Sequence, residues 1–223
     1  MKIIHLYAHS DLELLPAVKK AVEQDLLKES VALVTTIQHT KIILEVAEFL
    51  SKQGLAVTNY GNILGCMHPK VAEIPEKTLL YIGDGLFHPK GLCLRLKRDV
   101  VVANPATQQA FVLKKEEIAD IEKRLKGARL KFHTATQVGV LISVKSGQKT
   151  VQQTVPKIMK IQEKYPDKKF YFFGANTLDI QSLEDFPFIE VWMNTMCPRM
   201  VDDDVKFPKP MLNLMDLEGE NII

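Results

Sequence analysis

The sequence predicts an α/β protein made of two similar repeats, each a parallel sheet flanked by helices. Short β-prone runs alternate with stretches whose apolar residues repeat at helical spacing. The run from Val31 to Ile37 is almost continuously apolar and β-branched, as in a parallel strand buried on both faces. The same order of elements restarts after Gly127. We therefore expect one domain over residues 1–127 and a second over residues 128–223.

The first repeat begins with a β-prone run from Lys2 to Ala8. Asp11 is the expected N-cap of a helix whose apolar face extends from Leu12 to Leu26. A second helix, from Ile42 to Leu50, is expected to end at Gly54, because glycine is common at helix C-termini. The expected strands of this repeat are Val31 to Ile37, Leu55 to Tyr60, Thr78 to Ile82 and Val100 to Ala103. A polar helix is expected at Lys114 to Lys126.

The second repeat follows the same pattern of alternating strands and helices. The expected strands are Gly139 to Val144, Phe170 to Phe173 and Ile189 to Met193, and the expected helices are Thr150 to Lys164 and Ile180 to Phe186. The tail after Pro210 is expected to form one last strand or loop and a frayed end.

The composition is that of an ordinary globular protein. Its 223 residues are 46% apolar and 25% charged, with 29 Lys and Arg against 27 Asp and Glu. This near-neutral balance provides no broad positive field, so we expect no nucleic-acid binding. No apolar run approaches the roughly 18 residues of a membrane span, and the first residues do not follow the order of a secretory signal. We therefore expect a cytoplasmic protein without a membrane partner.

The unusual polar segments of the sequence follow predicted strands. In parallel sheets, functional loops lie beyond the carboxyl ends of the strands, where backbone amides converge. The segments at such positions are Gln38-His39 and residues 61–66, 83–89, 145–148 and 194–199. Cys66 and Cys197 lie in these loops, whereas Cys93 lies in an alternating apolar run and is expected to be structural. Three widely spaced cysteines without an export signal also argue against disulfides.

Thiolates from two such loops can meet at one metal, which is typical of iron–sulfur or zinc centres. We expect Cys66 and Cys197 to face one site, although their spacing does not decide between these centres and leaves inert thiols as the alternative. The segment Gly83-Asp84-Gly85 permits close backbone approach, and Asp84 can hold a hydroxyl or ammonium group. It is not a dinucleotide fingerprint, because His88 stands where that motif requires Gly or Ala.

Six motifs recur in the order in which they occur in a known family. They are Thr35-Thr36-Ile37-Gln38-His39, Asn62-Ile63-Leu64-Gly65-Cys66, Gly83-Asp84-Gly85-Leu86-Phe87-His88-Pro89-Lys90-Gly91-Leu92, Val144-Lys145-Ser146-Gly147-Gln148, Asn194-Thr195-Met196-Cys197-Pro198-Arg199 and Asp202-Asp203-Asp204. On these motifs the chain resembles the archaeal diphthamide synthases, the 2-(3-amino-3-carboxypropyl)histidine synthases, from residue 1 to Leu217. The resemblance implies that the two repeats correspond to the second and third domains of a three-domain, pseudo-symmetric family.

The resemblance also implies a radical enzyme in which one cysteine from each of three domains holds a four-iron, four-sulfur cluster. S-adenosylmethionine binds the free iron, its sulfur–γ-carbon bond is cleaved on reduction, and the 3-amino-3-carboxypropyl group is joined to a histidine of elongation factor 2. Cys66 and Cys197 match two of the cluster ligands. The residues expected at S-adenosylmethionine are Gln38, His39, Gly83, Asp84, Gly85, His88, Lys145, Gln148 and Arg199. Arg199 suits the carboxylate of this co-substrate, and Asp84 suits its amine or ribose.

The chain departs from the family at its front, where family members carry another domain with the first cluster cysteine. We therefore expect a short form that forms a homo- or hetero-oligomer with a chain supplying that domain. The third cluster ligand is expected from that chain, with Cys93 or a small thiol as alternatives. Two functional classes stay open: a transferase subunit, or a non-catalytic subunit that supports an active homologue. Quinolinate synthase, with three cysteines around one cluster, is a more distant resemblance.

Overall fold

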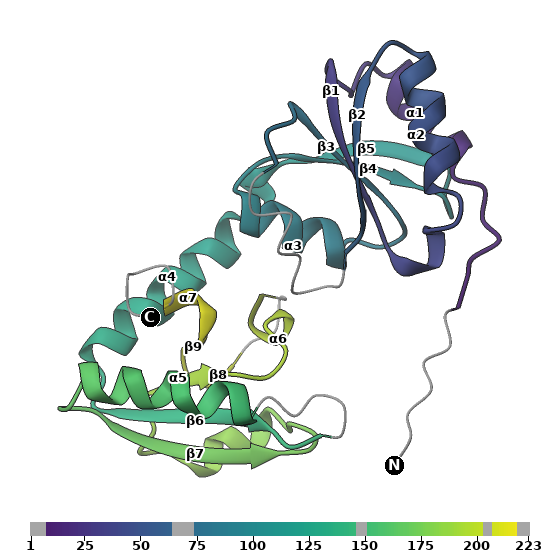
Figure 1. Cartoon of the computed structure of the whole chain (residues 1–223). Helices are drawn as coiled ribbons and strands as arrows, with labels where there is room; N and C mark the ends of the chain where they lie inside the picture. The colour runs from purple at the N-terminus through teal and green to yellow at the C-terminus, as the bar shows by residue number, and fades with distance from the viewer. Residues whose placement is uncertain (1–7, 64–73, 146–150, 203–206, 218–223) are drawn as a thin grey trace. The chain divides into compact units, whose positions relative to one another are not determined.

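A computed structural model describes residues 8–63, 74–145, 151–202 and 207–217 of the chain (Figure 1). The chain divides into two compact units, Met1–Ala119 and Asp120–Ile223. Each unit is built on a parallel or mainly parallel sheet with helices. This confirms the fold class predicted from the sequence. Residues 127 and 128, between which the sequence places a domain boundary, lie within a single helix, Ala119–Thr134.

The first unit contains a five-stranded sheet with the order β2-β1-β3-β4-β5. Its first four strands are parallel, and β5 pairs antiparallel with β4. The strand order reverses between β1 and β3, which is where open α/β sheets bind their ligands. The elements in chain order are α1 (Leu15–Glu23), β1 (Ser30–Thr35), the 3-10 helix η1 (Ile37–His39), α2 (Ile43–Lys52), β2 (Ala56–Asn62), β3 (Thr78–Ile82), α3 (Phe87–Leu96), β4 (Val100–Asn104), β5 (Gln109–Leu113) and the 3-10 helix η3 (Lys115–Ile118).

The core of the first unit explains the continuous apolar runs in its central strands. The apolar sides of α1 and α2 share one core with alternate strand residues such as Leu33, Leu80 and Ile82. Leu79 and Tyr81 alternate onto the opposite face of β3 and are fully buried as well. Because both faces of the strands are covered, the sequence shows no polar alternation there.

Three features of the first unit differ from the sequence-based expectations. Helix α1 begins at Leu15 rather than after Asp11, and no side chain caps its first turn, where a proline stands instead. Residues 87–96, which include the alternating apolar run around Cys93, form helix α3, an element that was not predicted. This helix buries most of its central residues and so has no clear 3.6-residue period. Strand β5 was not predicted, and most of the expected strand Lys2 to Ala8 lies outside the described residues.

The second unit contains a four-stranded parallel sheet with the order β7-β6-β8-β9. Its strand order reverses between β6 and β8. Within the described ranges of the chain, no helix is both long and apolar enough to cross a membrane. The elements are α4 (Ala119–Thr134), β6 (Gln137–Ser143), α5 (Val151–Lys164), β7 (Lys169–Ala175), the 3-10 helix η4 (Gln181–Asp185), β8 (Val191–Asn194), α6 (Arg199–Asp202), β9 (Met211–Asn213) and α7 (Met215–Leu217).

The two faces of this sheet are covered in different ways. One face packs against α4, α5 and α7 through a mainly aliphatic core that includes the buried ring of Phe132, with Tyr165 and Phe170 partly buried against it. On the other side Trp192, which is fully buried, contacts the rings of Phe173 and Phe186 at centroid distances of 4.9 and 6.2 Å. Gly139 makes room for Trp192, since a Cβ at this glycine would lie 2.4 Å from the indole ring. The glycine is therefore required by packing.

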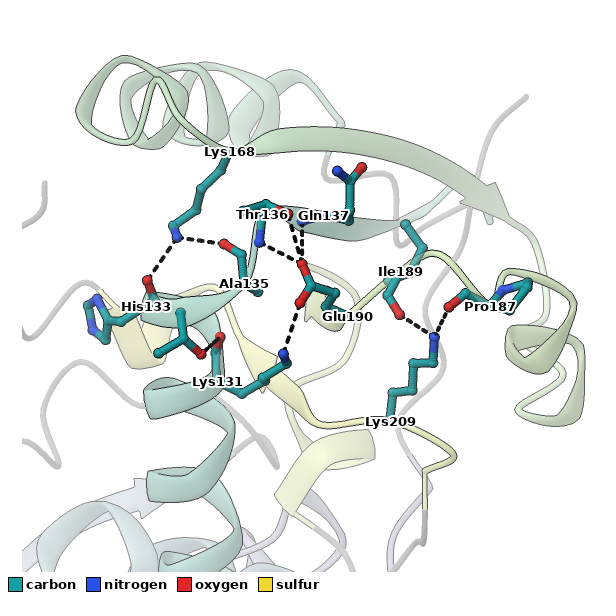
Figure 2. A network of polar contacts seen from close by, with 11 residues as sticks. Lys131, His133, Ala135, Thr136, Gln137, Lys168, Pro187, Ile189, Glu190 and Lys209 are labelled. Carbon is teal, nitrogen blue, oxygen red and sulfur yellow. Dashed lines mark hydrogen bonds and ion pairs between the residues drawn. The ribbon is translucent and has the colours of Figure 1, made fainter.

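A buried lysine and a partly exposed one satisfy backbone carbonyls in the second unit (Figure 2). Lys168, 8% exposed, donates to the carbonyl oxygens of His133 and Ala135 at 3.0 and 2.7 Å. These carbonyls lie at the C-terminus of α4, where the last carbonyl groups have no hydrogen-bond donor within the helix. Lys209 in the same way donates to the carbonyl oxygens of Pro187 and Ile189. Each cation thus fixes a connection between elements of the unit.

Glu190 joins the amino ends of β6 and β8 through a network of polar contacts (Figure 2). Its carboxylate accepts hydrogen bonds from the backbone amides of Thr136 and Gln137 at 2.7 and 3.0 Å and from the Lys131 ammonium at 2.9 Å. The Lys131 ammonium, followed by the two backbone amides, lowers the pKa of Glu190 to about 2. The carboxylate therefore stays ionised in the folded protein at pH values that would protonate it in the unfolded chain.

We expect Glu190→Gln to lower the free energy of unfolding of the second unit at pH 7 by about 1–2 kcal/mol. Because folding depresses the pKa of Glu190 from 4.5 to about 2, its contribution is fully present above pH 4.5 and disappears as the pH falls towards 2. Urea titrations at pH 7 and pH 3, followed by the fluorescence of Trp192, measure this difference. Glu23→Gln removes an exposed ion pair with Lys20 and serves as the control, because it is expected to change the free energy of unfolding very little. A loss of equal size at both pH values would contradict the prediction.

Candidate functional site

The loops after β1 and β3 begin side by side in the first unit. Thr35 pairs with Ile82 in the sheet, and the Thr35 hydroxyl donates to the Ile82 carbonyl oxygen at 2.8 Å. Beyond Thr35 the chain turns into η1, which is held by a bond from the His39 amide to the Thr36 carbonyl oxygen at 3.1 Å. The Ser10 amide also donates to the Gln38 carbonyl oxygen. The predicted residues Gln38 and His39 therefore lie at the carboxyl edge, where the strand order reverses.

The Gly83-Asp84-Gly85 segment after β3 depends on both of its glycines. Gly85 has φ +67°, a backbone conformation that side chains disfavour. A Cβ at Gly83 would lie 2.3 Å from the hydroxyl of Tyr81. The Asp84 side chain between them is exposed at this edge. The sequence thus forms a tight loop that presents one carboxylate.

Tyr81, on β3, packs against this loop from inside the unit. It is fully buried, and its hydroxyl lies 3.5 Å from both the Asp84 carbonyl oxygen and His88 Nδ1. The rings of Tyr81 and His88 stack at a centroid distance of 5.9 Å. Burial, followed by the charge of Asp84, raises the pKa of Tyr81, so the phenol stays protonated. His88, a predicted ligand-binding residue, is therefore positioned against a neutral phenol at the start of α3.

His39 is a predicted binding residue whose side chain is buried in the first unit. Its side chain is 2% exposed. Burial lowers the pKa of His39, and the negative charge of Asp84 on the neighbouring loop opposes that shift. The imidazole is accordingly neutral at pH 7. Gln38, by contrast, is exposed.

In the second unit, the loop after β8 is fixed by two asparagines. Asn194 Nδ2 donates to the Cys197 carbonyl oxygen at 3.0 Å and to Asn213 Oδ1 at 2.8 Å, and Asn194 Oδ1 accepts from the Met196 amide. Asn213 Nδ2 donates in turn to the Pro198 carbonyl oxygen. Both asparagines are 1% exposed. The backbone that carries Cys197 is therefore held in one conformation by buried side chains.

The cysteines differ in their surroundings. The Cys197 side chain is a free, exposed thiol on this fixed loop, at the carboxyl end of β8 and the strand-order reversal of the second unit. Cys93 forms no disulfide and is completely buried in α3. Cys66 lies outside the described residues, so the expected meeting of Cys66 with Cys197 stays a prediction.

The remaining predicted binding residues of the second unit fall on the same edge. Lys145 is exposed, two residues after β6, and its amide donates to the Ser143 hydroxyl. Arg199 begins α6 and is 3% exposed. Gln148 lies outside the described residues. The structure therefore places Lys145, Arg199 and Cys197 at the ends of adjacent strands, as the strand–loop rule predicts.

The donor chemistry of the Cys197 loop fits an iron–sulfur cluster. Cluster irons are bound by cysteine thiolates, which must be accessible and held on stable backbone. Cys197 meets both conditions. Among the residues that the structure describes, no group of three or more His, Cys, Asp or Glu side chains can hold a metal ion. Any cluster at Cys197 thus requires ligands from outside these residues.

Sequence reasoning missed the residues that position the loops. In the sequence, Tyr81 belongs to a run that predicts a buried strand, and nothing in the pattern distinguishes it from its apolar neighbours. Asn213 lies in the tail, far along the chain from the Cys197 loop, and contacts it only because β9 pairs with β8. Thr36 lies in a family motif but also inside the predicted strand Val31 to Ile37, and only the structure shows that β1 ends at Thr35 and that Thr36 follows it.

The comparisons with known proteins agree on one family. The sequence profile described as "Putative diphthamide synthesis protein" matches residues 1–219. Two curated proteins named 2-(3-amino-3-carboxypropyl)histidine synthase are similar to the chain: one from Pyrococcus horikoshii, 30% identical over 86% of this chain, and one from Methanocaldococcus jannaschii, 27% identical over 82%. The chain spans 57% and 49% of the length of these relatives.

Solved structures give the same result for the fold. Dph2 from Pyrococcus horikoshii matches with a TM-score of 0.78 and 27% identity, covering 95% of this chain and 63% of that one. The same protein has also been solved with a 4Fe-4S cluster, and that structure matches equally well. Since the family profile covers nearly the whole chain, this chain belongs to the diphthamide synthesis protein family.

Proposed function

We propose that the chain provides two units of a 2-(3-amino-3-carboxypropyl)histidine synthase, with Cys66 and Cys197 as ligands of a 4Fe-4S cluster. The transferred group would come from S-adenosylmethionine and be joined to a histidine of elongation factor 2. A further chain would supply the remaining cluster ligand. The family, the names of the relatives and the cluster in a structural neighbour support this proposal.

The observation that carries the proposal is the exposed thiol of Cys197 on its asparagine-fixed loop. A thiol that served only packing would be buried, as Cys93 is in α3. The backbone around Cys197 is held by buried polar side chains, as is common for outer-shell support of metal ligands. The contrast between the two cysteines therefore favours Cys197 as a ligand and Cys93 as a structural residue.

The chain's own residues would then bind and orient the co-substrate. When bound, the cluster would supply the electron and the open iron site for cleaving the sulfur–carbon bond. Arg199 offers a planar fork suited to the carboxylate of S-adenosylmethionine, and exposed Lys145 adds positive charge on the same edge. In the first unit, His88 presents an imidazole ring and Asp84 presents a carboxylate for its polar groups.

Anaerobic reconstitution with iron and sulfide tests the proposal. The chain alone is expected to hold the cluster weakly and lose it to air or a chelator, because two protein thiolates leave two exchangeable positions. A polypeptide carrying the family's first domain, added in trans, is expected to raise the iron and sulfide content and, with S-adenosylmethionine and dithionite as the one-electron reductant, to permit methylthioadenosine formation. Iron and sulfide analysis, electron paramagnetic resonance and product chromatography measure these effects.

A failure of the partner polypeptide to raise the iron content would contradict the proposal. If no partner polypeptide raises the iron content, the chain does not act as a cluster-binding subunit. The proposal is then wrong, and a non-catalytic subunit that supports an active homologue takes its place.

A further inference from the structure

Two buried polar atoms at the carboxyl edge of the first unit have no hydrogen-bond partner in the part of the chain that the structure describes. They are Thr36 Oγ1 and His39 Nδ1, on side chains that are 5% and 2% exposed. A buried polar atom without a partner costs about 1–3 kcal/mol, so such atoms call for an explanation. Two of them within one turn of η1 therefore point to an absent hydrogen-bonding group.

Their position fits a ligand site. Thr36 follows directly after Thr35, which pairs with Ile82 on β3, so both orphan atoms lie next to the Gly83-Asp84-Gly85 loop. This is the strand-order reversal of the first sheet, where α/β proteins bind ligands. The tight loop brings backbone close to this point, since neither glycine accommodates a side chain without strain or a clash.

The chemistry of the groups narrows the kind of ligand. A hydroxyl and a neutral imidazole are both uncharged, and burying an ion against them would leave its charge uncompensated. The nearby carboxylate of Asp84 repels carboxylates and phosphates but accepts readily from hydroxyls. A hydroxyl of the ligand can both donate and accept, so it satisfies Thr36 and His39 in either imidazole tautomer. A ligand with two neighbouring hydroxyls would best satisfy Thr36 Oγ1, His39 Nδ1 and the Asp84 carboxylate.

We propose that Thr36 and His39 form a subsite for the ribose hydroxyls of a nucleoside ligand, with Asp84 as a further acceptor. The inference rests on the proposed function, because S-adenosylmethionine contains such a ribose. It adds Thr36 to the binding residues and assigns the first unit to the nucleoside end of the co-substrate.

Methylthioadenosine is the probe, because it keeps the nucleoside but lacks the amino and carboxylate groups. Calorimetry measures its binding to the full chain without a cluster, beside its 2′,3′-dideoxy analogue. Thr36→Val keeps the shape of the side chain but removes the hydroxyl, and is expected to weaken methylthioadenosine binding about tenfold. Thr36→Ser, the matched control, keeps the hydroxyl and most of the affinity. The dideoxy analogue is expected to bind the wild type and Thr36→Val equally weakly.

Stability gives a second readout that separates a ligand site from a structural role. Thr36→Val removes an unsatisfied buried hydroxyl, so the ligand-free chain is expected to unfold at the same or a higher temperature. A hydroxyl needed for folding would give the opposite shift. The inference is overturned if Thr36→Val binds methylthioadenosine like the wild type, if the diol makes no difference, or if the wild type does not bind the probe.

These outcomes are distinct from failure of the proposed function. A chain that takes up the cluster with its partner but ignores methylthioadenosine would overturn the ribose subsite alone. A chain that binds methylthioadenosine with the expected dependence on Thr36, but never takes up a cluster, would support the subsite and overturn the transferase proposal.

Discussion

Cys197→Ala should deprive the chain of most of its capacity to bind an iron–sulfur cluster. Removal of an outer-shell partner of a metal ligand already costs about 10- to 100-fold in metal affinity, so loss of a ligand itself should cost at least as much. The variant should still fold, because the Cys197 side chain is exposed and the loop is fixed by Asn194 and Asn213. Iron and sulfide analysis after anaerobic reconstitution with the partner polypeptide measures the loss.

Cys93→Ala is the matched control for this experiment. It removes a thiol of the same chemistry from the interior of α3, where Cys93 is fully buried. Iron content should be unchanged, while the stability of the first unit should fall by about 1 kcal/mol through lost packing. Cys66→Ala should behave like Cys197→Ala. Retained iron in Cys197→Ala, or lost iron in Cys93→Ala, would reverse the assignment of the ligands.

Gly139→Ala is expected to destabilise the second unit by about 2–3 kcal/mol. The added Cβ would lie 2.4 Å from the ring of Trp192 and 3.0 Å from a methyl group of Ile189, and Trp192 is wedged between Phe173 and Phe186. The indole therefore has no direction in which to move freely. Urea unfolding followed by Trp192 fluorescence reports on this unit, because the chain contains a single tryptophan.

Gly127→Ala is a control that is expected to change the stability in the opposite direction. Gly127 lies within α4, and a Cβ there would meet no atom within 4 Å. Alanine is favoured over glycine in helices, so this change should stabilise the unit by about 0.5–1 kcal/mol. If both variants shift the unfolding midpoint in the same direction, the packing argument for Gly139 fails.

The sequence was sufficient for the fold class and for the position of the polar loops. Period-3.6 and continuous apolar patterns reflect burial within single elements, so β1, β3, α5 and β6 lie close to where they were predicted. Because functional loops of parallel sheets follow the strands directly, the places of Asp84, Lys145 and Cys197 at the carboxyl edges were also predictable. Gly127, at which the expected domain boundary was placed, lies within α4, and local sequence patterns do not distinguish a glycine inside a long helix from one that ends a helix.

Only the tertiary structure decided what surrounds these loops. The pairing of β8 with β9 brings Asn213 to the Cys197 loop, and the fold of residues 87–96 into α3 buries Cys93. The orphan atoms of Thr36 and His39 likewise follow from the alignment of β1 with β3. Contacts of this kind join residues far apart in the chain or depend on strand order, whereas local sequence patterns record only which face of one element is buried. The fold class could therefore be inferred from the sequence, but the partners of each functional side chain could not.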